Sequence, residues 1–300
     1  MADNEAKTVE AKKPAAPSLN ALKKRKSPIY MAIIYIVSII LAILCILPFY
    51  LLFVNATRST NEIQMHALSL VPSHFIKTNW NVFNGKEFKP IVGFKNSLIV
   101  STCSTALAVY FSALTAYALT AYEWKLREPF FGFIMGVMMI PGQLSSIGFY
   151  QMCWKLGLTN KLYMLIIPSI AAPMMVFFYR QYLQASLSLE IVESARIDGA
   201  GEFYTFNKIV LPIMKPAMAT QAIFSFVGSW NNLFMPSILL TKKEVKTMPI
   251  MVALLRGDIY RTEHGAIYLG LFLTVLPLLI VYLCLSRYIV SGVALGAVKG

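Results

Sequence analysis

The chain has 300 residues, of which 57% are apolar and only 14% are charged, and its formal net charge is +13. Average soluble domains are about 45–50% apolar and about 25% charged, so a mean hydropathy of +0.62 indicates a membrane protein. This composition excludes a water-soluble enzyme, a disulfide-stapled secreted module and a wholly disordered protein. The basic excess could suggest a nucleic-acid partner. In membrane proteins, however, Lys and Arg gather in loops and set the topology, so no nucleic acid is expected.

The first 28 residues are polar, rich in Ala, Lys and Pro, and free of apolar periodicity, which predicts a disordered cytoplasmic tail over 1–28. A tetrabasic cluster, 23–26, closes this tail just before the apolar run 29–54. Residues 54–56 resemble a signal-peptidase site, but a run of 26 residues exceeds the core of about 7–15 residues in a signal peptide. We therefore expect an uncleaved first span whose N-terminus is cytoplasmic.

Five further apolar segments are long enough to span a bilayer, which needs about 20 residues per helix. They lie at 92–121, 130–151, 161–180, 213–240 and 266–290. The predicted organisation is a first helix with an external loop (29–91), a transmembrane domain (92–290) and a C-terminal tail (291–300). With both termini cytoplasmic, 15 of the 27 basic residues fall inside, a weak bias that the tetrabasic cluster reinforces.

The spans differ in their small residues and prolines. The second predicted span has a small residue at every fourth position, which predicts a helix face for close packing. These residues are Ser104, Ala108, Ser112, Ala116 and Thr120. Later spans contain prolines that remove backbone donors and kink helices: Pro141, Pro168, Pro173, Pro236 and Pro277. Such breaks suit a pathway that opens and closes, although static bundles contain them too.

Motifs for catalysis are absent from the sequence. It contains no phosphate-binding loop, H-E-x-x-H or G-x-S-x-G pattern, and its four cysteines lie in apolar stretches without metal-ligand spacing. No carboxylate or Lys lies deep inside a predicted span, whereas ion-coupled carriers usually need one. If the protein moves a solute against a gradient, we expect another subunit to supply the energy.

One predicted internal loop, 186–212, is too polar to span and too patterned for a plain linker. Ser188 can cap a short helix, Glu190 suits its positive first turn, and Gly199 can supply the positive φ that ends it. One face of this helix would carry Leu189, Val192 and Ala195, and a second short helix would carry Phe203, Phe206 and Ile209 before Pro212 opens the fifth span. The pair could lie on the membrane surface or dock a cytoplasmic partner.

The residues of this loop resemble the "EAA" loop of binding-protein-dependent ABC transporter permeases. That pattern is E-A-A, a Gly three residues on, nine residues, and I-x-L-P; here it reads Glu193-Ser194-Ala195, Asp198-Gly199-Ala200 and Ile209-x-Leu211-Pro212. Ser194 replaces the first Ala, and Ser188 stands where Pro is frequent. Further short matches resemble the carbohydrate-uptake branch, on its MalG-like side: 47–49, 96–98, 141–143, 157–158, 180–181, 229–232 and 296–300.

The resemblance implies an all-α membrane protein of six transmembrane helices with a type I importer (MetI-like) core. It implies a heterodimer with a homologous permease, two cytoplasmic ATPase subunits that bind ATP and Mg²⁺, and an extracytoplasmic sugar-binding protein, in a bacterial inner membrane. This chain would have no catalytic site, metal or cofactor of its own. In the loop, Glu193 would anchor the ATPase, Ala195 and Ala200 would permit close seating, and Gly199 would make the turn.

Candidates for the sugar pathway follow from the chemistry of sugars, which bind amides, hydroxyls and aromatic faces. They are Trp230, Asn231 and Asn232 in the fifth predicted span and Tyr150 and Gln151 in the third. The two asparagines could instead form hydrogen bonds between helices. Two other classes remain open at this point, a self-sufficient carrier or channel and a membrane-embedded enzyme. The absence of buried charges and of paired acid and base residues disfavours both.

Overall fold

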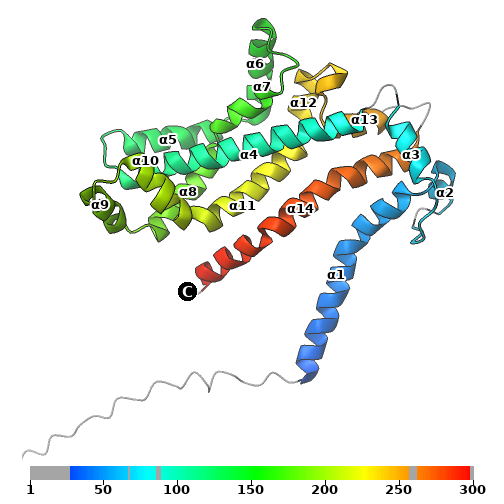
Figure 1. The fold of residues 1–300 in the computed structure, drawn as a ribbon, viewed down its shortest axis with the longest axis horizontal. Coiled ribbons are helices and arrows are strands. Elements are labelled where there is room, and N and C mark those ends of the chain that lie inside the picture. The colour runs from blue at the N-terminus through cyan, green and yellow to red at the C-terminus, as the bar shows by residue number, and fades with distance from the viewer. Residues whose placement is uncertain (1–27, 67, 86–88, 257–261, 298–300) are drawn as a thin grey trace, which may run out of the picture. The chain divides into compact units, whose positions relative to one another are not determined.

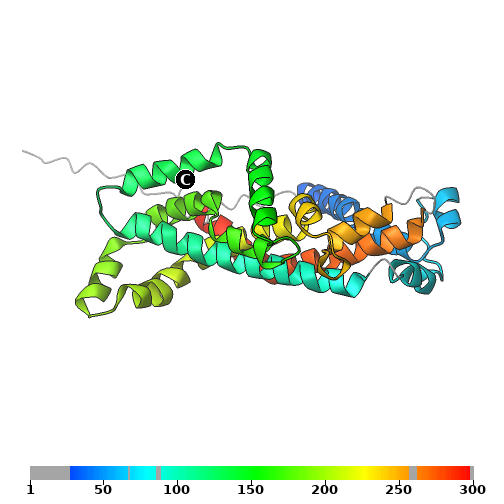
Figure 2. The ribbon, with the colours of Figure 1, turned by 90° about the horizontal axis from the view of Figure 1, so that it is seen from above.

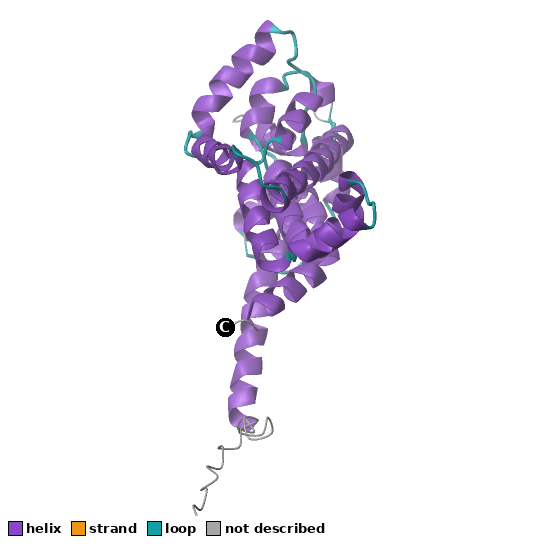
Figure 3. Cartoon of the chain, turned by 90° about the vertical axis from the view of Figure 1, so that its left-hand side faces the viewer, coloured by secondary structure: helices purple, strands orange, loops and turns teal. Residues whose placement is uncertain are grey.

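The computed structural model describes residues 28–66, 68–85, 89–256 and 262–297, and within these ranges it is helical without strands (Figure 3). The first helices are α1 (Pro28–Ala56), α2 (Thr60–Met65), α3 (Ile76–Phe83), α4 (Pro90–Ala121), α5 (Arg127–Met138), α6 (Gly142–Lys155), α7 (Tyr163–Ile166) and α8 (Pro173–Ser186). They are followed by α9 (Leu189–Ile197), α10 (Glu202–Thr205), α11 (Leu211–Trp230), α12 (Phe234–Leu239), α13 (Met248–Arg256) and α14 (His264–Ala297). Short 3₁₀ or π turns cover Ile167–Ile170, Phe206–Val210 and Lys243–Val245.

The chain divides into two compact units, the first ending at Pro48 and the second beginning at Phe49. The part of α1 that belongs to the first unit, 28–48, exposes apolar side chains on every face. A helix that is apolar all round and has 29 residues is long enough to span a bilayer. One helix, α1, thus covers the first predicted span, while the tail predicted for residues 1–28 lies almost wholly outside the described residues.

The second unit is built around α4, which packs against α8 and α11, while α11 also packs against α14 (Figure 1). The predicted ribbon of small residues makes these contacts possible, because Ser104, Ala108, Ser112 and Ala116 are all buried. The hydroxyl groups of Ser104 and Ser229 lie 3.0 Å apart, joining α4 to α11. Small side chains let helix backbones approach closely, which is how helices associate in lipid.

The third predicted span, 130–151, is not one helix. Instead α5 and α6 meet at an angle of 91° across residues 139–141 (Figure 2). Pro141 stands at the N-cap of α6, where its missing N–H costs nothing, and proline disfavours helical backbone in the residue before it. Among the described residues, five helices are long and apolar enough to cross a membrane, or six if this bent pair counts as one span. The all-α fold class is confirmed.

The fourth and fifth predicted spans also have different limits. The fourth is a broken segment, Tyr163–Ser186, with Pro173 opening α8. The fifth runs from Glu202 to Trp230, so the expected span 213–240 starts and ends too late. Pro212 does not start a new helix, because a π turn, Phe206–Val210, leads directly into α11. In a regular α-helix, residue 212 would donate its N–H to the carbonyl four residues earlier, but proline has no N–H. A π turn just before Pro212 suits the loss of that bond.

The helix α5 buries none of its own residues, and polar and aromatic contacts attach it to α8. The Arg180 guanidinium of α8 donates to the Glu128 carboxylate over 2.6 Å and lies 4.0 Å from the centre of the Phe131 ring. Phe131 also stacks on Phe177 at 6.3 Å. The Arg180 side chain is 8% exposed, whereas that of its partner Glu128 is 58% exposed.

Candidate functional site

The loop 186–212 forms two short helical arms at the end of α4 where α4 reaches Ala121 (Figure 1). The first arm is α9, with Ser188 at its N-cap and Glu190 in its first turn, as predicted. The Ser188 side chain makes no capping hydrogen bond, which differs from the expectation. The second arm, α10, does not stop at Pro212 but continues through the π turn into α11. The loop is thus rigidly continuous with a long helix.

The turn between the arms is the one the sequence predicted. Gly199 has a φ of +79°, a conformation that glycine adopts without the steric cost of a Cβ. The Ala200 N–H donates to the carbonyl of Ala195 over 2.9 Å, and the Asp198 N–H donates to that of Ser194, also over 2.9 Å. These bonds satisfy the last carbonyls of α9, as in other glycine-terminated helices.

One face of the loop belongs to the main hydrophobic core. Val192 is 1% exposed and belongs to the same buried cluster as Phe206 and residues of α4, α8 and α11. Ala195 is 6% exposed but stands outside that cluster. Two residues that the sequence placed on the apolar faces of the two arms are exposed instead. Leu189 of α9 is 45% exposed and Phe203 of α10 is 67% exposed. Val192 and Phe206 hold the loop in the core, while these two side chains are left on its surface.

The opposite face of the loop is free to meet another protein. Glu193, Ser194 and Asp198 are exposed, and so is Ile197 at 86%. An open hollow of about 550 Å³ lies between the arms, lined by Ala195, Asp198, Gly199, Ala200, Gly201, Tyr204 and Ile209. Leu211 is half-buried and Pro212 exposed beyond it. A hollow with small residues at its base, beside exposed acidic and apolar side chains, can seat a protruding protein element.

A charged group that the sequence did not single out lies within this loop. Glu202, the first residue of α10, accepts hydrogen bonds from Arg196 of α9 and from Tyr117 and Tyr122 at the end of α4. Burial raises the pKa of the Tyr122 hydroxyl above its usual range. The only sequence signal was the opposite charge of residues 196 and 202, six positions apart. The tyrosines are 80 and 85 residues from Glu202 and gave no signal.

The structure scatters the five predicted pathway residues. Trp230 is 1% exposed, donates its indole N–H to the Thr274 carbonyl over 2.9 Å and stacks on Phe226, so it joins α11 to α14. Tyr150 is half-buried and packs with the apolar cluster around Cys153. Gln151 and Asn231 are exposed, and Asn231 is the C-cap of α11 rather than an interior residue.

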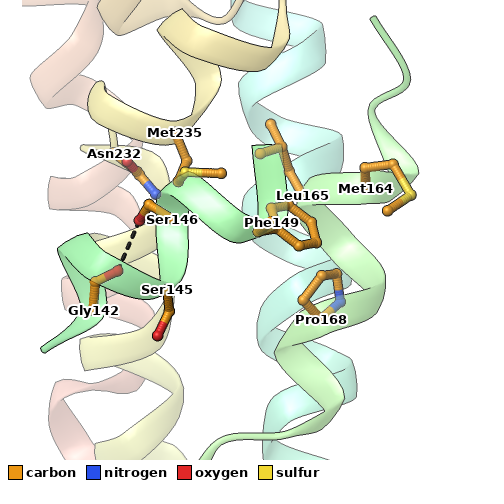
Figure 4. A pocket seen from close by; sticks show the side chains of 9 residues that line it. All are labelled: Gly142, Ser145, Ser146, Phe149, Met164, Leu165, Pro168, Asn232 and Met235. Carbon is orange, nitrogen blue, oxygen red and sulfur yellow. Dashed lines mark hydrogen bonds between the residues drawn. The ribbon is translucent and has the colours of Figure 1, made fainter. Parts of the chain in front are cut away.

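Asn232 is the one pathway candidate that lines a described cavity. This cavity, of about 320 Å³, is bounded by Gly142, Ser145, Ser146, Phe149, Met164, Leu165, Pro168, Asn232 and Met235 (Figure 4). Its lining comes from α6, from the segment 164–168 and from residues 232 and 235, with no residue of α5. The Ser146 hydroxyl donates to the Gly142 carbonyl over 2.8 Å. The cavity combines an aromatic ring, hydroxyls and an amide, which are groups that contact sugars.

Among the described residues, no three His, Cys, Asp or Glu side chains lie close enough to share a metal ion. The four cysteines are free thiols; Cys153 is buried and the other three are exposed.

Comparison with known proteins places the chain in a family. Residues 96–295 match the family described as binding-protein-dependent transport system inner membrane component. The arabinooligosaccharides transport system permease protein AraQ of Halalkalibacterium halodurans is 32% identical, over 93% of this chain and 100% of the relative. The trehalose/maltose transport system permease protein MalG of Thermococcus litoralis is 32% identical, over 69% of this chain and 74% of the relative.

A solved structure shares the fold. The crystal structure of a bacterial ABC transporter involved in the import of the acidic polysaccharide alginate contains a chain that superposes with a TM-score of 0.73. The two are 21% identical, and the match covers 88% of this chain and 98% of that one. With a family match over residues 96–295 and relatives aligned along most of its length, this chain belongs to the inner-membrane permease components of binding-protein-dependent ABC transport systems.

Proposed function

We propose that this chain is one of two homologous permease subunits of an ATP-driven importer for a sugar or oligosaccharide. The curated relatives carry the names of saccharide transport systems, which supports this substrate class. The chain contains no catalytic motif, so ATP and Mg²⁺ would be bound by two cytoplasmic ATPase subunits. An extracytoplasmic binding protein would deliver the sugar.

The observation that carries the proposal is the construction of the loop 186–212. Val192 fixes α9 in the core of the permease, while Glu193 and Ile197 stay exposed near an open hollow that Ala195 lines. A segment attached to the spans on one side and available on the other can transmit force from a bound partner. Glu193 would pair with a basic residue of the ATPase, and Ala195 and Ala200 would leave room for close seating.

This proposal sets the orientation of the chain. If the loop 186–212 meets an ATPase, the α9 end of the helices faces the cytoplasm, and α2, α3 and α13 lie on the opposite side of the membrane. The tetrabasic cluster at 23–26 supports the same orientation, because positive residues beside the first span favour the cytoplasm. Both termini would then be cytoplasmic in the inner membrane of a bacterium.

The sugar pathway is proposed at the cavity beside Asn232. Phe149 offers a ring face, and the Ser145 hydroxyl and the Asn232 amide are exposed. We expect Asn232→Ala to raise the KM for uptake while the sugar transported per ATP hydrolysed stays constant. Gln151→Ala is the control, because Gln151 is exposed but outside the cavity lining. Equal KM values for the two variants would remove Asn232 from the pathway.

The coupling role is tested by Glu193→Lys. The complex is purified through a tag on this chain, reconstituted in vesicles with the binding protein, and supplied with labelled arabinotriose or maltotriose. We expect uptake per ATP hydrolysed to fall at least about ten-fold, within the range of coupling energies between sites. Glu123→Lys is the control, since Glu123 is also exposed at the α9 end.

Two results would contradict the proposal. Wild-type uptake in Glu193→Lys would reject Glu193 as the anchor. Uptake by this chain without any co-purifying ATPase would favour a self-sufficient carrier or channel instead.

A further inference from the structure

A single carboxylate joins the two arms of the loop 186–212 to the core helix α4. One oxygen of Glu202 accepts from Arg196 Nε over 2.7 Å. The other oxygen accepts from the hydroxyl of Tyr117 over 3.2 Å and from that of Tyr122. Arg196 belongs to the last turn of α9, Glu202 opens α10, and the tyrosines stand in and just after the last turn of α4. Three elements therefore meet at Glu202.

The surroundings fix the positions of the donors. Tyr117 is 2% exposed and stacks on Phe206 with ring centres 5.5 Å apart, which holds its ring, and hence its hydroxyl oxygen, in place beside Glu202. Tyr122 packs edge-on against Tyr117 at 5.8 Å. The Arg196 guanidinium lies 5.1 Å from the centre of the Tyr122 ring, which adds a second contact between α9 and the end of α4.

The simplest alternative is a surface ion pair that only shapes the turn. The Arg196 and Glu202 side chains are 36% and 44% exposed, and exposed pairs contribute little to stability. That alternative leaves the tyrosines unexplained, because a pair within the loop needs no donor from α4. Hydrogen bonds to a charged acceptor are about twice as strong as neutral ones, and two of them hold Glu202 to α4.

We propose that Glu202 is a positioning residue that passes the movement of α9 to the cytoplasmic end of α4. The inference rests on the proposed function, in which an ATPase seats on α9. Movement of α9 would be carried by Arg196 to Glu202 and from there to Tyr117 and Tyr122. Because α4 contacts both α8 and α11, a displacement at its end would reach the centre of the permease.

The test uses the complete reconstituted complex and the labelled oligosaccharide that the wild type takes up. In Glu202→Ala we expect the ATPase to remain bound and to hydrolyse ATP, while uptake per ATP falls by about five-fold or more. Tyr117→Phe and Tyr122→Phe together should give a similar loss. If all three residues act in one chain, adding the Tyr→Phe pair to Glu202→Ala should cause no further loss.

Matched variants separate this role from a structural one. Glu123→Ala removes an exposed carboxylate one residue from Tyr122 and should leave the uptake ratio unchanged. Glu202→Gln keeps an oxygen for the tyrosines but loses the charge, so it should fold even if Glu202→Ala does not, and it should lose part of the coupling.

Three outcomes would overturn the inference. An unchanged ratio in both Glu202 variants would remove its transmitting role. Additive losses with the tyrosine variants would show that the residues act independently. Loss of the bound ATPase in Glu202→Gln would make Glu202 a docking residue. Failure of the proposed function itself is recognised differently, because then even the wild-type chain would retain no ATPase.

Discussion

The two ends of the unit formed by residues 49–297 each contain a polar cluster, and the two clusters are built from different kinds of partner. At the α3 end, Arg58 is 5% exposed, and its guanidinium donates to the backbone carbonyls of His66 and Glu62 over 2.6 and 2.8 Å. Asn79 donates to the carbonyls of Ala56 and Arg58 over 2.8 and 2.9 Å. These buried side chains bond mainly to backbone atoms, whose positions the fold fixes, although Arg58 also donates to the Asn55 side-chain oxygen over 3.3 Å.

At the α9 end, the acceptor is the half-exposed Glu202 side chain, and its donors are side chains of other elements. Side chains can change partners with a change of rotamer, whereas backbone carbonyls move only with their segment. The comparison indicates that the cluster of Arg58 and Asn79 at the α3 end, called the clasp below, is rigid. The cluster around Glu202 at the α9 end can instead rearrange. Substitutions should therefore reduce stability at the first and coupling at the second.

The largest effect is expected at Gly265, in the first turn of α14. A Cβ at this position would overlap the Arg58 carbonyl oxygen and the Asn79 amide. Because the overlapped atom is backbone within the clasp, we expect Gly265→Ala to lower the free energy of unfolding by about 3 kcal/mol. Denaturant titration of the purified protein in detergent measures this value. Gly136→Ala is the control, since no atom lies within 4 Å of its added Cβ. Similar losses in both variants would disprove the clasp.

The next largest effect is expected from Asn79→Ala. It leaves the carbonyls of Ala56 and Arg58 without their side-chain donor in a buried site, which costs about 2 kcal/mol of unfolding free energy. Gln64→Ala, on the exposed surface of α2, should change stability by less than about 0.5 kcal/mol. The same denaturant titration compares the two. A neutral Asn79→Ala would mean that these carbonyls are satisfied by other donors.

A smaller effect on stability, but a clear one on transport, is expected from Gly199→Val. Space around the position is open, so the cost is that of a left-handed backbone, about 1–2 kcal/mol for a residue with a Cβ. The turn between α9 and α10 would shift, and uptake per ATP should fall. Gly199→Asn is the control, because asparagine tolerates this conformation better than valine. Equal behaviour of the two variants would show that the turn geometry is unimportant.

The smallest effect concerns pH at the α3 end. The Ser59 N–H, with help from the Ser73 hydroxyl and Arg58, holds the pKa of Glu62 below its usual value. A lowered pKa in the folded state stabilises the fold above the unfolded-state pKa, and this contribution disappears as the pH falls through the folded pKa. The thermal midpoint of the wild type should therefore fall further than that of Glu62→Gln as the pH is lowered from neutral, through the unfolded-state pKa of about 4.3, to about pH 3. Parallel curves would mean that Glu62 does not stabilise α2.

Local patterns in the sequence predicted those parts of the fold that depend on local chemistry. The apolar run of α1, the small residues along α4 and the Gly199 turn are properties of neighbouring residues, and the structure has all three. The resemblance of the loop 186–212 also led to the family that the comparisons establish. The limits of α11 were misjudged, because hydropathy alone does not show that a polar arm can continue as helix into a span.

By itself, then, the sequence determined a multi-pass helical membrane protein with one patterned loop, because hydropathy, spacing and turn chemistry act over a few residues. Only the tertiary structure decided the 91° break between α5 and α6, the burial of Trp230 and the convergence on Glu202. A proline shows that a helix can break but not through what angle. Tyr117 and Glu202, 85 residues apart, meet only because the packing of α4 against α8 and α11 brings them together.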